Sequence, residues 1–119
     1  MHNFKDLKVW QKAIELATSI YQVTSSFPNE EKFGLTSQMR RASVSIPSNI
    51  AEGSARTSRK AFANSLEISL GESFELETQM EIAKRIGFLS EEQINTLTAS
   101  VSEIQRMLVG LKSSLDLRS

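Results

Sequence analysis

Residues 94–115, INTLTASVSEIQRMLVGLKSSL, carry the most regular apolar pattern in the chain. Its apolar residues recur at alternating intervals of three and four, which keeps side chains on one side of an α-helix. No polar residue interrupts this stripe, so the segment predicts a long amphipathic helix. Ser90 and Gln93 form a capping-box signature at its start. The stripe consists of Ile94, Leu97, Val101, Ile104, Leu108, Leu111 and Leu115.

The N-terminal segment carries two apolar stripes with the same alternation, and Pro28 and Asn29 end it. A wide apolar arc predicts a helix that contacts neighbours on two sides. The first stripe is Leu7, Trp10, Ile14, Ala17 and Tyr21; the second is Val9, Ala13, Leu16, Ile20 and Val23.

A further helix is predicted from Gly34 to Gly53 and Ser54. Pro47 removes one backbone donor, but Ile50 still falls four residues after Ile46, so the spacing favours a kinked, continuous helix over a break. Its stripe is Leu35, Met39, Ala42, Ile46, Asn49 and Gly53.

Another helix is predicted from Thr57 or Ser58 to Gly87. Small residues at Ser69, Gly71 and Ser73 predict that a neighbouring backbone approaches its middle closely. Its stripe is Phe62, Leu66, Ser69, Ser73, Leu76, Met80 and Ala83.

These four segments define the fold class. No segment alternates with period two, so strands are not predicted. The 119 residues suffice for one hydrophobic core and are too few for two. We therefore expect an all-α protein whose single domain, residues 1–119, is an antiparallel up-and-down four-helix bundle.

The composition excludes several classes of enzyme. Without Cys there is no disulfide framework, thiolate zinc site or cysteine nucleophile. The single histidine, His2, stands at the terminus and away from the predicted helices, and no glycine-rich phosphate loop is present. Pairs such as Glu72 with Glu75, or Glu77 with Glu81, are interpreted as solvated helix positions. We expect no catalytic residue, cofactor, metal site or small-molecule substrate.

The chain begins without a signal-peptide pattern, and its longest apolar run, residues 107–111, is too short to cross a bilayer. We therefore expect a cytoplasmic protein with no membrane contact.

Charge is polarised along the sequence although the formal net charge is zero. Residues 32–60 hold six cations against one acid, whereas residues 61–92 hold seven acids against two cations. The two segments either neutralise each other across a helix pair or present separate faces to different partners.

Five cations are candidates for nucleic-acid contact through phosphates. Against this, Glu52 precedes Arg56 by four residues and pairs with it in the simplest interpretation. The five are Arg40, Arg41, Arg56, Arg59 and Lys60.

Three polar residues interrupt the apolar stripes: Asn49, Ser69 and Ser73. A satisfied structural role is favoured for Asn49, because a polar group in a seam demands a polar partner. A small-ligand pocket beside Ser69 and Ser73 is a minor alternative.

Aromatic residues collect near the predicted helix ends and are expected to plug the ends of the bundle. Together with the double stripe of the N-terminal helix, they leave more apolar surface than a slender monomer hides, which favours self-association. They are Phe4, Phe27, Phe33 and Phe88.

Several motifs resemble the bacterial four-helix-bundle proteins encoded in intervening sequences of large-subunit ribosomal RNA genes. The most specific is Ser-Ile-Pro-Ser-Asn-Ile-Ala-Glu-Gly at residues 45–53. The others are Phe-x-Asp-Leu-x-Val-Trp at 4–10, Phe-Gly-Leu-Thr-Ser-Gln-Met-Arg-Arg-Ala at 33–42 and Glu-Leu-Glu-Thr-Gln at 75–79.

The resemblance implies a ring-like homopentamer. It also implies kinship with accessory proteins of diversity-generating retroelements, which engage RNA and a reverse transcriptase through a basic surface; Arg40 and Arg41 match the motif. The leading hypothesis is a non-catalytic homo-oligomer, a pentamer with head-to-tail contacts. The alternative is an RNA or reverse-transcriptase accessory module whose salt-sensitive binding is lost when the five cations become Ala.

Overall fold

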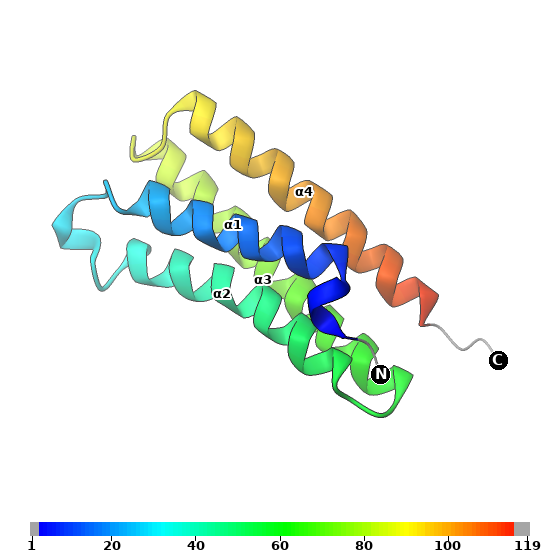
Figure 1. Ribbon diagram of the computed structural model, residues 1–119. Coiled ribbons are helices and arrows are strands. Elements are labelled where there is room, and N and C mark those ends of the chain that lie inside the picture. Colours follow the sequence, from blue (N-terminus) through cyan, green and yellow to red (C-terminus); the bar gives the residue numbers. More distant parts are fainter. Residues whose placement is uncertain (1–2, 116–119) are drawn as a thin grey trace.

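Figure 1 shows four long helices that run side by side in alternating directions. The computed structural model describes residues 3–115, which form a rod of 49 × 23 × 20 Å and contain no strand. The predicted all-α four-helix bundle is confirmed. None of the helices in this range is both long and apolar enough to cross a membrane. The elements are η1 (Phe4–Asp6), α1 (Lys8–Thr24), η2 (Asn29–Glu31), α2 (Leu35–Ser54), α3 (Arg59–Arg85) and α4 (Glu91–Ser114).

The helix ends follow from local hydrogen bonds. The predicted capping box is confirmed: Ser90 Oγ accepts from the Gln93 N–H at 3.1 Å, and Gln93 Oε1 accepts from the Ser90 N–H at 2.9 Å. Ser58 caps α3 by accepting from the Ala61 N–H. Gly87 ends α3 with a φ of +86°, a left-handed conformation that glycine adopts without strain.

Helix α2 continues through Pro47 without a break, as predicted. The buried hydroxyl of Ser69 on α3 donates to the carbonyl oxygen of Ile46 at 2.9 Å, one residue before the proline. This bond ties α3 to the middle of α2.

The core is formed mainly by one stripe from each helix, and α1 contacts neighbours on two sides, α2 and α4, as predicted. The second stripe of α1 faces the core, with Val9, Ala13, Leu16 and Ile20 buried. In the first stripe Ile14 is 39% exposed and Tyr21 is 45% exposed. The first stripe of α1 runs along the outer edge of the contact with α2, so part of it is exposed to solvent.

Helices α2 and α3 form the most extensive helix pair, and they approach at Gly53. A Cβ atom built on Gly53 would lie 2.5 Å from Ser65 Cβ, which is shorter than any real contact of this kind. The prediction that Gly71 allows a close approach is wrong, since nothing lies within 4 Å of its Cβ position. Gly71 points away from the core.

The aromatic residues plug only part of the bundle ends. Phe27 and Phe88 pack together with ring centroids 5.2 Å apart, as expected of end plugs, and Phe4 packs edge-on against Trp10. Phe33 is different: it is 89% exposed, so the prediction that it closes the bundle is wrong. The η2–α2 loop carries its ring outward because the core at that end is already filled by Phe27.

Candidate functional site

Arg40 is held by the end of α1. Its Nε donates to Thr24 Oγ1 at 2.9 Å, its Nη2 donates to the carbonyl oxygen of Tyr21 at 3.3 Å, and its guanidinium lies 4.5 Å from the centre of the Tyr21 ring. The guanidinium donates to a carbonyl in the last turn of α1, which the Thr24 hydroxyl also bonds at 3.3 Å, and adds a cation–π contact. Arg40 therefore joins α1 to α2.

The other four predicted cations divide between the two ends of α2. Arg41 forms an ion pair with Glu75 of α3 at 3.2 Å, near the start of α2. Arg56 forms the predicted pair with Glu52 at 3.9 Å, and Arg59 and Lys60 are exposed at the start of α3. Because the 20 residues of α2 span about 30 Å, the structure does not bring the five together.

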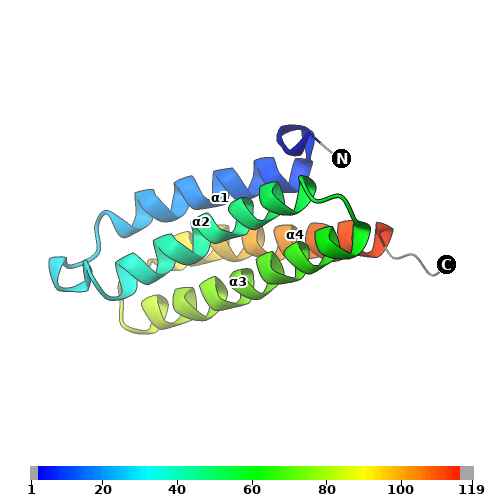
Figure 2. The ribbon, with the colours of Figure 1, turned by 90° about the horizontal axis from the view of Figure 1, so that it is seen from below.

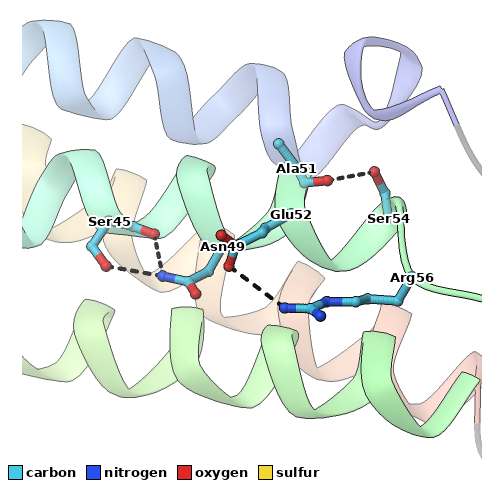
Figure 3. Close-up of polar contacts among 6 residues, drawn as sticks. All are labelled: Ser45, Asn49, Ala51, Glu52, Ser54 and Arg56. Atoms are coloured by element: carbon cyan, nitrogen blue, oxygen red, sulfur yellow. Dashed lines mark hydrogen bonds and ion pairs between the residues drawn. The ribbon is translucent and has the colours of Figure 1, made fainter. Parts of the chain in front are cut away.

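The predicted polar seam is satisfied inside the molecule. Figure 3 shows Asn49 Nδ2 donating to the carbonyl oxygen of Ser45 at 2.9 Å and to its Oγ at 3.0 Å, so Asn49 bonds within its own helix. Ser69 and Ser73 are fully buried, and their hydroxyls donate to the carbonyl oxygens of Ile46 and Leu70. Both serines lie inside the packed core rather than beside an open pocket.

A group of polar side chains on the α2–α3 seam was missed by the sequence analysis. Glu75 Oε2 accepts from Arg41 Nη2 at 3.2 Å and from Gln79 Nε2 at 3.4 Å. Glu72 lies on the same side of α3, and its Oε1 is buried without a hydrogen-bond partner, as is Oε1 of Gln79. The interpretation of Glu72 and Glu75 as solvated positions is wrong, since both are half-buried against α2. The three-residue spacing of Glu72 and Glu75 does not show whether they face solvent or lie at the edge of the contact with α2.

Burial raises the pKa of Glu72 above its ordinary value. A hydrogen bond with Glu75 and repulsion by its charge raise this pKa further, and Arg41 partly offsets the rise. One arginine faces two carboxyl groups, so the folded seam stabilises the charged form of Glu72 less than water does, and its pKa is raised.

We expect the substitution Glu72→Gln to stabilise the protein above pH 5. An acid with a raised pKa stabilises the fold below its unfolded value of 4.5, and this contribution is lost as pH rises through the folded value. Glutamine mimics the protonated acid, so thermal unfolding from pH 5 to 8 should show a flatter profile and a Tm about 1–3 °C higher at pH 8. An unchanged pH profile would contradict the raised pKa of Glu72.

An apolar groove runs between α1 and α2 on the outside of the bundle. It encloses about 320 Å³ and contains no charged side chain among the residues that line it. Val44 is 42% exposed at this groove, and Ile14 contributes the exposed part of the first α1 stripe. The lining residues are Phe4, Trp10, Ile14, Ala17, Val44, Pro47, Ser48 and Ala51.

Most residues of the groove and all those of the α2–α3 seam lie within a segment that matches one protein family. Residues 5–110 match the family model described as 23S rRNA-intervening sequence protein. The chain belongs to this family. As a family member it is also similar to a solved structure from Bacteroides thetaiotaomicron, described as a protein of unknown function from the S23 ribosomal protein family.

That structure has a TM-score of 0.82 and 31% sequence identity, and the alignment covers 88% of this chain and 95% of the other. No curated protein matches the chain. The family description names the genetic origin of these proteins, and the description of the solved structure states that its function is unknown. No catalytic activity is indicated for this member of the 23S rRNA-intervening sequence family.

Proposed function

We propose that this protein is a non-catalytic, self-associating helical bundle whose working form is a closed homo-oligomer, a ring of five copies. The observation that supports it is the uncharged apolar groove between α1 and α2. A continuous apolar surface in water favours association, because burying it contributes about 25 cal/mol per Å². A second copy is the occupant that we assign to the groove.

The charge pattern supports contacts between unlike surfaces. Arg59 and Lys60 stand exposed at the start of α3, while α3 beyond them carries five glutamates. Only one ion pair among residues 3–115, Arg41 with Glu75, joins the basic segment 32–60 to the acidic segment 61–92. Glu67 and Glu81 pair with Lys112 and Arg85 inside the molecule, so Arg59 and Lys60 are the exposed cations that we assign to head-to-tail contact between neighbouring copies.

The groove is tested with Val44→Glu. The new carboxylate would sit at an exposed position, so the fold should persist, but docking would bury it without a partner. We expect light scattering of wild type to give a mass near five protomers. The variant should weaken association by at least about tenfold, which is 1.4 kcal/mol.

The matched control is Val109→Glu on α4, a valine of similar exposure, 49%, that does not line the groove. This control should assemble as wild type does. A wild-type protein that is a monodisperse monomer at micromolar concentration would refute the proposal, and full assembly of Val44→Glu would exclude the groove.

Nucleic-acid contact stays a prediction. Arg40 is engaged by α1, Arg41 by Glu75 and Arg56 by Glu52, which leaves Arg59 and Lys60 at the start of α3 as the cations of this set available for phosphates. The placement of the five thus favours self-association over the RNA-accessory alternative.

A further inference from the structure

The loop before α2 presents an apolar ring beside a positive charge. Phe33 is 89% exposed, more than any other large apolar side chain that the structure describes. Lys32 Nζ lies 5.5 Å from the centre of the Phe33 ring. An exposed phenylalanine at a loop tip contributes nothing to the core of its own bundle, so its ring is free to enter another surface.

A hollow of about 540 Å³ opens on the outer side of α3 and α4. Its apolar lining includes Phe74 and Ile82, which are 53% and 47% exposed, together with Ile94. Glu77 and Glu81 contribute carboxylates to the same hollow, and Arg85 contributes one guanidinium. The hollow therefore combines an apolar floor with negative charge.

The hollow suits the Lys32–Phe33 pair in two respects. Its volume exceeds that of a phenyl ring, and ligand pockets of roughly 300–1,000 Å³ are typical of apolar binding sites. Two carboxylates against one guanidinium leave a net negative charge, and the carboxylate of Glu77, which is not in an ion pair with Arg85, complements the ammonium of Lys32. Arg85 hydrogen-bonds Glu81 at 2.9 Å and lowers the pKa of that carboxyl, so Glu81 is ionised at neutral pH.

The hollow of the same molecule does not hold this loop. Phe33 follows η2, on the connection between α1 and α2, which Figure 2 shows at one end of the bundle. The residues that line the hollow belong to α3 and α4. The high exposure of Phe33 shows that its ring occupies no pocket of its own chain.

We propose that Lys32 and Phe33 of one copy dock into the α3–α4 hollow of a second copy. This inference rests on the proposed self-association and names a second contact beside the α1–α2 groove. Because loop and hollow are different surfaces, the contact is heterologous: each copy offers one loop and one hollow, which generates a ring when the rotation closes.

Two surface variants test the contact. Phe33→Ser removes the ring, and Ile82→Glu places a charge in the hollow; both positions are exposed, so helical circular dichroism should match wild type. Each variant alone should weaken association by about tenfold or more, as for an aromatic anchor. Ile68→Glu, on the same helix at 54% exposure and outside the hollow, should assemble as wild type does.

Mixing the variants gives the decisive measurement. Phe33→Ser retains an intact hollow and Ile82→Glu an intact loop, so an equimolar mixture should recover one loop contact per pair and form more dimer than either variant alone. Wild type that assembles while Phe33→Ser assembles equally well would overturn this contact and leave the groove proposal standing. Wild type that stays monomeric would instead overturn self-association itself.

Discussion

Replacing Ile104 with alanine should lower the free energy of unfolding by about 3–4 kcal/mol. Ile104 is 1% exposed at the centre of the α4 stripe and packs into the single core shared by all four helices. The smaller side chain loses transfer free energy and leaves a cavity that rigid helices fill poorly, and buried Ile→Ala changes cost about 2–5 kcal/mol. Denaturant unfolding followed by circular dichroism measures the loss.

The matched control is Val109→Ala on the same helix. Val109 is 49% exposed, and this change should alter stability by no more than about 0.5 kcal/mol. Since a domain of this size has only about 5–15 kcal/mol of stability, the Ile104 variant should lose a large share of it. Equal denaturant midpoints for the two variants would show that the apolar stripe of α4 does not contribute to the stability of the core.

Replacing Gly53 with alanine should destabilise the protein by about 1–2 kcal/mol, although alanine is the better helix former. A Cβ at this position would meet Ser65 Cβ at 2.5 Å and Phe62 Cδ1 at 2.9 Å, so α2 and α3 would have to move apart. Overpacking costs about 1–3 kcal/mol or more, against a gain in helix propensity of about 1 kcal/mol. Thermal unfolding measures the balance.

Gly71→Ala serves as the control, because its Cβ would meet nothing within 4 Å. This variant should be more stable than wild type by about 0.5–1 kcal/mol. Adding Ser65→Gly to Gly53→Ala removes the obstructing Cβ, so the double variant should be more stable than the sum of the two single changes predicts. Strict additivity would contradict the close approach.

Most of the fold was predictable because one signal dominates it. A repeat of three and four specifies a helix whatever its neighbours are, and Ser90 with Gln93 places the start of α4 from local hydrogen bonds alone. The spacing does not say which of two apolar stripes on α1 faces inward, since both have the same period. That choice depends on how α1 lies against α2.

The candidate surfaces were less predictable, because they depend on distances between helices. The five cations are near one another in sequence yet lie at both ends of α2. Glu72 and Glu75 resemble ordinary surface glutamates until α2 is placed beside them. Phenylalanine is a residue type common in protein cores, so the sequence favours burial of Phe33. Only the structure shows that its ring is exposed.

The four neighbouring helix pairs differ in how extensively they pack, and this difference determines which pair we expect to separate first. Helices α2 and α3 interlock around Gly53, whereas α1 and α4 form the least extensive of the four neighbouring pairs. Their cross-link, Lys12 with Glu103 at 3.7 Å, joins two side chains more than 40% exposed and adds little. We therefore expect local unfolding to separate α1 from α4 more readily than it separates α2 from α3.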